Sequence, residues 1–287
     1  MLKESNCLET TEYASPCVLL LGGFDGLHIG HKKLLDCAKA YGLPVGIMTI
    51  LGGKGRELFT SAERREIFSR AGIDFFFSES FTPQFRDTDR ETFLTNLLRR
   101  YNVRALVCGE DFRFGKGAAG TPDFLRTFTG LPVRAEDILQ VDGQKVGTSF
   151  VKQCLAAGKV ARANELLVFP FFLRGTVEAG RHVGHTYGFP TANFSYPPEK
   201  FPLKEGVYAI HAALDGKIYR GIANFGPCPT FGVEYRKAEA YFEGFQGNLY
   251  GKTVDLVFDG YLRDIRKFPD QAALAAQLRE DIRRALQ

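Results

Sequence analysis

The pattern of apolar residues changes near residue 168, and this change most constrains what the chain can fold into. Before that point, short apolar runs alternate with segments whose apolar residues recur every three or four positions. After it, the segments are short, punctuated by glycine and proline, and rich in β-branched and aromatic residues. The first pattern predicts a parallel sheet with helices, and the second predicts a closed antiparallel barrel. We therefore expect an α/β domain over residues 1–167 and a β domain over residues 168–287.

Apolar spacing and turn residues place the elements of each domain. In the first half, we expect strands at residues 17–21, 45–50, 73–77 and 105–108, and helices at residues 31–41, 61–71 and 89–101. One more helix is expected at residues 151–167, just before the boundary. In the second half, we expect strands at residues 206–211, 218–224, 238–245 and 253–258, and a terminal helix at residues 270–286.

Composition narrows the class of protein. The 287 residues are 45% hydrophobic and 24% charged, which suffices for two packed cores. The net charge of +4 is spread without a block of like charges, so we expect no dedicated nucleic-acid binding. The start lacks an apolar run, and no stretch approaches the roughly 18 apolar residues of a membrane span. Six scattered cysteines without a CxxC pair indicate reduced thiols, so we expect a cytoplasmic protein. We also expect a monomer or a weak homo-oligomer.

A glycine-rich segment with two histidines follows the first expected strand. Residues 21–31 read LGGFDGLHIGH, which places His28 and His31 at the start of the next expected helix. Glycines let the backbone approach phosphates closely, and free N–H groups at a helix N-terminus attract anions. The imidazoles could stabilise charge on an attacked phosphate, although a glycine-rich turn with two surface histidines has the same sequence pattern. The position after a buried strand favours the ligand site.

A second informative segment lies early in the β domain. Residues 188–193 read GFPTAN and follow a glycine-rich stretch. Thr191 and Asn193 offer neutral oxygens, which suit a Mg²⁺ ion that keeps water and phosphate ligands. Phosphoryl transfer needs positioning, Mg²⁺ and a base for the attacking hydroxyl, and a carboxylate on a later strand could be that base. Considered alone, the six residues are equally typical of a turn that enters a strand.

The first domain resembles a known family. Residues 24–31 (FDGLHIGH) and 109–115 (GEDFRFG) are similar to two motifs of nucleotidylyltransferases, in particular the N-terminal half of bifunctional bacterial riboflavin kinase/FAD synthetase. The resemblance implies a Rossmann-like nucleotidylyltransferase fold with catalytic His28 and His31. It implies nucleotide-binding Gly22, Gly23, Phe24, Asp25, His28, His31, Ser149 and Lys152, and flavin-binding Asp111, Phe112 and Phe114. Two segments, residues 48–56 and 146–152, depart from the family's usual motifs.

The second domain resembles the riboflavin kinase half of the same family over residues 168–287. The matching segments are 188–193, 206–209, 224–231, 239–245, 249–252 and 262–268. The resemblance implies Glu239 as general base, with Glu243 as the competing carboxylate, and Thr191 and Asn193 as Mg²⁺ ligands. It further implies nucleotide-binding Gly180, Gly184, His185, Thr191 and Asn193, and flavin-binding Arg263 and Phe268. His185 and Cys228 stand where the family usually has arginine.

The resemblance therefore predicts an ATP- and Mg²⁺-dependent riboflavin kinase that makes FMN, coupled to adenylylation of FMN to FAD. Riboflavin, FMN and ATP would be its small-molecule partners, and FAD a product. Two alternatives stay open: a riboflavin kinase whose first domain is degenerate or repurposed, and a non-catalytic flavin- or nucleotide-binding regulator. The presence of Thr191, Asn193 and Glu239 favours an enzyme. A single-strand nucleic-acid binder ranks last, because acidic residues interrupt any basic stripe.

Overall fold

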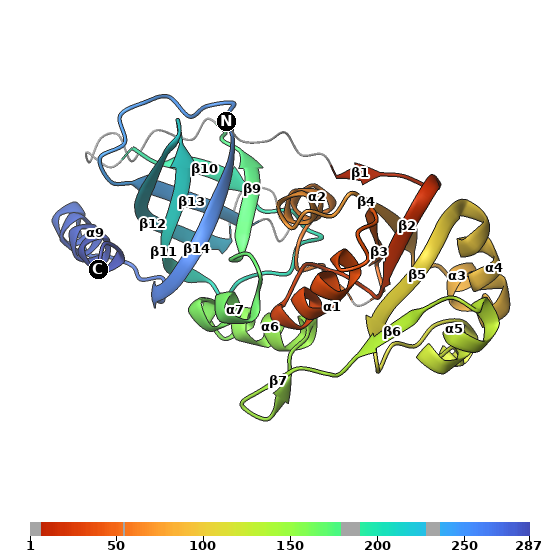
Figure 1. The fold of residues 1–287 in the computed structure, drawn as a ribbon. Coiled ribbons are helices and arrows are strands. Elements are labelled where there is room, and N and C mark those ends of the chain that lie inside the picture. Colours follow the sequence, from red (N-terminus) through yellow and green to blue (C-terminus); the bar gives the residue numbers. More distant parts are fainter. Residues whose placement is uncertain (1–6, 54, 179–189, 228–235) are drawn as a thin grey trace. The chain divides into compact units, whose positions relative to one another are not determined.

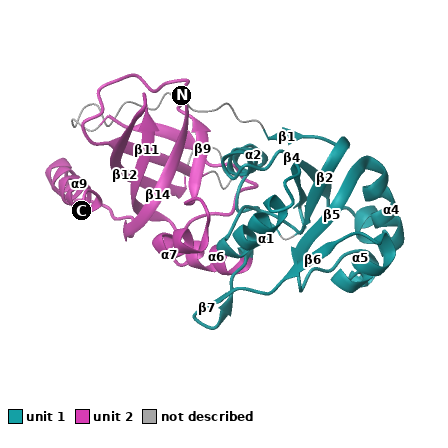
Figure 2. Ribbon diagram, in the orientation of Figure 1, with its two compact units in different colours: residues 1–148 teal, residues 149–287 magenta. Residues whose placement is uncertain are grey.

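The computed structural model describes residues 7–53, 55–178, 190–227 and 236–287, which form two compact units (Figure 1, Figure 2). Unit 1 ends at Thr148 and unit 2 begins at Ser149. This division falls before the expected domain boundary at 167/168, because the two helices between the sheets belong to unit 2. No helix in the described part of the chain is long and apolar enough to cross a membrane.

Unit 1 contains one six-stranded sheet in which every pairing is parallel, as the alternating pattern predicted. In spatial order its strands are β1 (Leu8–Glu9), β4 (Phe75–Ser80), β3 (Val45–Leu51), β2 (Tyr13–Leu21), β5 (Tyr101–Gly109) and β6 (Val133–Glu136). The strand order reverses between β2 and β5, so the chain winds outward from this pair in both directions. Such a reversal is where ligands bind in open α/β sheets.

Helices cover both faces of this sheet. Figure 1 shows α1 (Ile29–Lys39) and α2 (Ser61–Arg70) on one face, and α4 (Arg90–Arg100) and α5 (Pro122–Thr129) on the other. The three helices predicted in this half are confirmed, and α4 ends one residue earlier than expected because β5 already begins at Tyr101. Apolar spacing did not predict α5, β1 or β6, nor α3 (Pro83–Arg86), the 3₁₀ turn η1 (Lys116–Ala118) and the small hairpin β7–β8 (Gln140–Val141, Gln144–Lys145).

Capping residues explain where these helices begin. Thr60 and Glu63 form a reciprocal capping box at α2, in which each side chain accepts a hydrogen bond from the other's backbone N–H. The side chains of Asp89 and Thr121 accept N–H bonds at the starts of α4 and α5 in the same way. The start of α1 differs, because its N-cap is His28, and this places an imidazole at the end of a helix.

Unit 2 contains one six-stranded sheet in which every pairing is antiparallel. In spatial order its strands are β10 (Ala192–Ser195), β13 (Arg236–Phe242), β12 (Lys217–Pro227), β11 (Gly206–Leu214), β14 (Thr253–Arg263) and β9 (Phe172–Thr176). A bridge between Glu178 and Asn193 links the chain just after β9 to β10, the opposite edge of the sheet. This closure confirms the expected barrel.

The segment before the barrel departs from the expectation of one helix at residues 151–167. It forms two helices, α6 (Thr148–Ala156) and α7 (Val160–Leu166). Gly158 lies between them with φ of +75°, a left-handed conformation that ends α6 and that the apolar spacing alone does not reveal.

The terminal helix α9 (Gln271–Ala285) is confirmed close to its predicted position. Ile282 on α9 packs on Val207 of β11 and Ile222 of β12, so the helix covers one side of the barrel.

Candidate active sites

The two motifs of unit 1 meet at the carboxyl edge of its sheet. Leu21 at the end of β2 pairs with Cys108 of β5, so Gly22 and Gly109 follow at the same edge. The segment 22–28 then leads into α1, and the segment with Asp111 and Phe112 leaves β5. The sheet's strand-order reversal thus brings together residues that lie more than eighty positions apart in the sequence.

His28 and His31 form a stacked pair whose tautomers are set by the backbone. Their ring centroids lie 3.5 Å apart. His28 Nδ1 accepts a hydrogen bond from the His31 backbone N–H at 3.2 Å, so in the neutral ring the proton is on Nε2. His31 Nδ1 lies 3.1 Å from the carbonyl oxygen of Gly26, which only accepts, so His31 carries its proton on Nδ1. His28 therefore offers a donor, and His31 a lone pair, at their Nε2 atoms.

Both imidazoles are neutral near pH 7. Burial is the largest cause and lowers the pKa of His28 to about 4; Lys145 lowers this pKa further, and Asp111 opposes the shift. Burial, and then the neighbouring His28, hold the pKa of His31 well below its usual range. An incoming triphosphate would place negative charge beside both rings, which favours their protonated forms.

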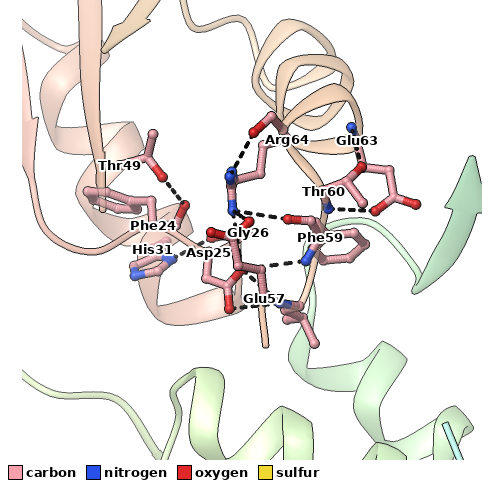
Figure 3. Close-up of polar contacts among 12 residues, drawn as sticks. Phe24, Asp25, Gly26, His31, Thr49, Glu57, Phe59, Thr60, Glu63 and Arg64 are labelled. Atoms are coloured by element: carbon pink, nitrogen blue, oxygen red, sulfur yellow. Dashed lines mark hydrogen bonds and ion pairs between the residues drawn. The ribbon is translucent and has the colours of Figure 1, made fainter. Parts of the chain in front are cut away.

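Asp25 fixes the turn that precedes these histidines (Figure 3). Its carboxylate accepts the backbone N–H of Leu58 at 2.8 Å and that of Phe59 at 3.4 Å. The buried Thr49 hydroxyl donates to the carbonyl oxygen of Phe24 at 3.1 Å. Neither Gly22 nor Gly26 could carry a side chain unless a neighbouring ring moved. A Cβ at Gly22 would lie 2.9 Å from the Phe24 ring, and a Cβ at Gly26 would lie 2.6 Å from the Phe59 ring. Gly23 has no such close neighbour, since a Cβ there would only touch Ile50.

The residues expected at the flavin have distinct surroundings. Asp111 forms an ion pair with Lys145, close to His28. Phe112 stacks on Phe114 with ring centroids 5.5 Å apart. Phe114 is only 8% exposed and belongs to the core of unit 1, so Phe112 is the more accessible of the two rings. The flavin-binding role of these three residues stays a prediction.

The third expected nucleotide motif lies on another part of the chain. Ser149 is exposed on α6, and Lys152 one turn later places its ammonium 5.6 Å from the centre of the Phe201 ring. Both residues belong to unit 2, and their nucleotide-binding role stays a prediction.

The barrel aligns three polar residues across neighbouring strands. Asn193 of β10 pairs with Glu239 of β13, and Glu239 pairs with Asn224 of β12. Directly paired residues point to the same face of a sheet with Cβ atoms about 5 Å apart. Glu239 and Asn224 are exposed, and the alanines on either side of Glu239 face the barrel core, so this row lies on the outer face.

Residues around this row complete the candidate kinase site. Thr191 is half-buried and precedes Asn193 by two positions, and Asn193 itself is 7% exposed. Glu243, the competing carboxylate, follows the end of β13 and accepts a hydrogen bond from the Tyr241 hydroxyl at 3.0 Å. Glu239 is therefore the carboxylate in register with Asn193.

Arg263 and Phe268 occupy the region where β14 meets α9. The buried Arg263 guanidinium binds both carboxylate oxygens of Asp281 at 2.7 to 3.1 Å and lies 5.6 Å from the centre of the Phe268 ring. Gln277 donates to the same carboxylate at 2.9 Å. This gives Arg263 a role in holding α9, while the predicted flavin contact of Arg263 and Phe268 stays a prediction.

Gly180, Gly184, His185 and Cys228 lie outside the described residues. Within the described ranges, no three or more His, Cys, Asp or Glu side chains gather in a way that could hold a metal ion. An ion at Thr191 and Asn193 would therefore rely on phosphate and water oxygens for most of its ligands.

Three residues near the sites were not singled out from the sequence: Arg64, Lys145 and Asn224. Asn224 opens a segment that matched the family, and its register with Glu239 follows only once the strands are paired. Lys145 lies in a short hairpin without a sequence signal, and Arg64 lies on α2, whose sequence does not show which of its several charged residues is buried.

Fold and site together define a class: a Rossmann-like nucleotidylyltransferase unit followed by a riboflavin-kinase-type antiparallel barrel. A family model described as FAD synthetase matches residues 10–150, and one described as riboflavin kinase matches residues 167–287. The bifunctional riboflavin kinase/FMN adenylyltransferase of Bacillus subtilis (strain 168) is 31% identical over 297 residues, covering 96% of this chain and 93% of the relative. That of Escherichia coli (strain K12) is also 31% identical, covering 92% of this chain and 90% of the relative.

The solved structures agree on the fold. A crystal structure described as a macrolide-efflux protein from Streptococcus pneumoniae superposes with a TM-score of 0.86 at 26% identity, covering 96% of this chain and 97% of that one. The chain belongs to the bifunctional riboflavin kinase/FMN adenylyltransferase family, as its motifs predicted.

Proposed function

We propose that this protein phosphorylates riboflavin to FMN with ATP in unit 2 and adenylylates FMN to FAD with a second ATP in unit 1. Relatives that carry both activities in their names match over almost the whole chain. The observation that carries the proposal is the pairing of Asn193 with Glu239 on the outer face of the barrel, together with the stacked imidazoles at the switch point of the sheet.

In the adenylyl transfer, an oxygen of the FMN phosphate attacks the α-phosphorus of ATP and diphosphate leaves. Negative charge grows on the phosphate oxygens during this step. The Nε2–H of His28 can donate to one such oxygen, and a hydrogen bond that strengthens as charge develops lowers the barrier. We assign Gly22, Gly23, Phe24 and Asp25 to the loop that receives the nucleotide.

In the phosphoryl transfer, the ribityl hydroxyl of riboflavin attacks the γ-phosphorus of ATP and ADP leaves. We assign Glu239 as the base that takes the hydroxyl proton. Thr191 and Asn193 would hold Mg²⁺ through their neutral oxygens, and the ion, when bound, would neutralise phosphate charge. The exposed position of Glu239 leaves room for a substrate hydroxyl on the outer face.

The test is direct. Purified protein is incubated with Mg²⁺, ATP and either riboflavin or FMN, and the flavins are separated by chromatography. FMN from riboflavin and FAD from FMN are the expected products. FMN without any FAD would reduce the function to riboflavin kinase alone, and no conversion of riboflavin would overturn the kinase proposal.

A further inference from the structure

Arg64 on α2 is a charged side chain buried next to the loop that holds the candidate adenylyl-transfer histidines (Figure 3). Its side chain is 1% exposed. One terminal nitrogen, Nη1, lies 2.9 Å from a Glu57 carboxylate oxygen and 3.5 Å from Asp25 Oδ1. A guanidinium removed from water is costly unless its donors are engaged and its charge is balanced. Glu57 and Asp25 balance that charge here.

The same guanidinium also reaches the backbone and the helix start. Nη1 donates to the carbonyl oxygen of Phe59 at 3.0 Å, and Nη2 donates to the Ser61 hydroxyl at 3.2 Å. Arg64 therefore ties the segment between β3 and α2 to the first turn of α2. A planar fork with several donors can serve these partners at once, whereas a lysine ammonium is a single point charge.

Further contacts connect the segment that Arg64 holds to the two histidines. The Asp25 carboxylate accepts the N–H groups of Leu58 and Phe59, so a movement of the segment between β3 and α2 would also move the turn after β2. The Phe59 ring also packs on Gly26, where an added Cβ would lie 2.6 Å from it. The carbonyl oxygen of Gly26 is in turn the acceptor that orients the His31 ring. An unbroken set of contacts thus runs from Arg64 to the imidazole pair.

We propose that Arg64 is a positioning residue for adenylyl transfer. It acts through Asp25 and Phe59 to hold the Gly26 carbonyl, which fixes the tautomer and the orientation of His31 and of the stacked His28. The inference rests on the proposed function for its kinetic consequence, while the effect on the imidazoles stands on the geometry alone. A displacement of about 1 Å in such a group lowers a rate by about a hundredfold.

The test uses Arg64→Lys in the full chain, because this change keeps the charge and removes the fork. We expect kcat for FAD formation from FMN to fall by about 10- to 100-fold, with a much smaller change in KM for ATP. FMN formation from riboflavin in unit 2 should stay unchanged. The matched control is Arg65→Lys, since Arg65 is exposed on the same helix and pairs with Glu9 at the surface; it should leave both reactions unchanged.

A second measurement distinguishes a loss of histidine positioning from a general destabilisation of unit 1. Nitrogen NMR of the histidine rings should show His31 protonated on Nδ1 in the unmodified protein and a mixture of tautomers in Arg64→Lys. Should Arg64→Lys not fold, Glu57→Gln weakens the same cluster at a half-buried position and is expected to shift the tautomers in the same direction. Unchanged tautomers and an unchanged FAD rate in a folded variant would overturn the proposal.

The two proposals fail differently. If the unmodified protein makes no FAD from FMN, the function assigned to unit 1 is wrong, and the tautomer experiment still decides the role of Arg64. If the unmodified protein makes FAD and the lysine variant makes it equally well with unaltered rings, only the positioning role is wrong.

Discussion

The neutral imidazoles at the start of α1 make the stability of unit 1 depend on pH. The pKa of His28 is lowered to about 4 in the folded state, from an ordinary value of 6.5. Between these values the unfolded state binds more protons, so the free energy of unfolding falls as the pH drops from 7 towards 4. For His28 alone we expect a loss of about 2 kcal/mol at pH 5 relative to pH 7, measured by urea unfolding.

The variant His28→Gln is the control for this dependence, because glutamine does not titrate. It should make the stability profile between pH 7 and pH 5 less steep by the contribution of His28, while His31 still contributes. Glu136 affects stability in a lower pH range. The hydrogen bond from Lys33 is the largest cause that lowers the pKa of Glu136 to about 2. The stabilisation from Glu136 is therefore lost only as the pH falls from 4.5 through 2. A profile that stays equally steep in His28→Gln would mean that other groups cause it.

Single residues were predictable from the sequence where a local motif carries them. His28 and His31 stand in a glycine-rich segment between a strand and a helix, so both their chemistry and their place followed from the order of residues. Arg64 could not be found in this way, because its burial depends on Asp25 and Glu57, which approach it only in the folded unit. The register of Asn193, Glu239 and Asn224 likewise depends on two strand pairings that no local spacing specifies.

At the scale of single elements, β12 and β13 approach too closely for any side chain at Gly221. A Cβ there would lie 1.8 Å from the backbone oxygen of Tyr241. Gly221→Ala must therefore push apart the pair of strands that carries Glu239 and Asn224. We expect a destabilisation of several kcal/mol, on the order of 2–4, and a loss of FMN formation.

Gly260→Ala is the matched control for that substitution. Gly260 lies on β14 of the same barrel, and a Cβ there meets no atom within 4 Å. Thermal unfolding and the riboflavin assay should show little change for this variant. A tolerated Gly221→Ala would show that β12 and β13 can separate without disturbing the row that includes Glu239.

The helix α9 is attached to the barrel by a buried ion pair as well as by apolar contacts. Asp281 is 0% exposed and accepts hydrogen bonds from Arg263 and Gln277. Removal of one partner leaves a buried charge uncompensated, so Asp281→Ala should lower the free energy of unfolding by about 3–5 kcal/mol. Replacing both partners, in Arg263→Met with Asp281→Leu, should recover much of that loss in urea unfolding. A double variant as unstable as Asp281→Ala would mean that the charges themselves stabilise the packing of α9.

The break between α6 and α7 shows that apolar spacing alone does not predict where a helix ends. Apolar residues continue at helical spacing across residues 151–167, so the sequence favoured one helix. The outcome was decided by Gly158, whose left-handed conformation ends α6, and by the Leu155 carbonyl, which accepts the backbone N–H of Lys204 just before β11. The broad change from helix-and-strand alternation to short strands was predictable, because it reflects which faces of the two sheets are buried.

At the scale of the whole molecule, each unit has its own sheet and its own core, and the proposed chemical groups divide between them. His28 and His31 belong to unit 1, and Thr191, Asn193 and Glu239 belong to unit 2. We therefore expect the two reactions to be separable by single substitutions. His28→Gln should lower FAD formation from FMN by about 10²–10³-fold, because it changes the ring that donates to the phosphate, and should leave FMN formation unchanged.

Glu239→Gln should have the reverse effect, because an amide cannot accept the ribityl proton. General-base catalysis contributes about 10²–10⁴-fold, so FMN formation should fall by that factor while FAD formation from added FMN persists. Glu243→Gln is the matched control, since that carboxylate lies beyond the end of β13 and binds the Tyr241 hydroxyl. The measurement is the same flavin chromatography with riboflavin or FMN as the substrate. If Glu243→Gln abolished FMN formation and Glu239→Gln did not, the base would be Glu243. If either substitution lowered both reactions equally, the two sites would depend on each other, and the division of chemistry between the units would be wrong.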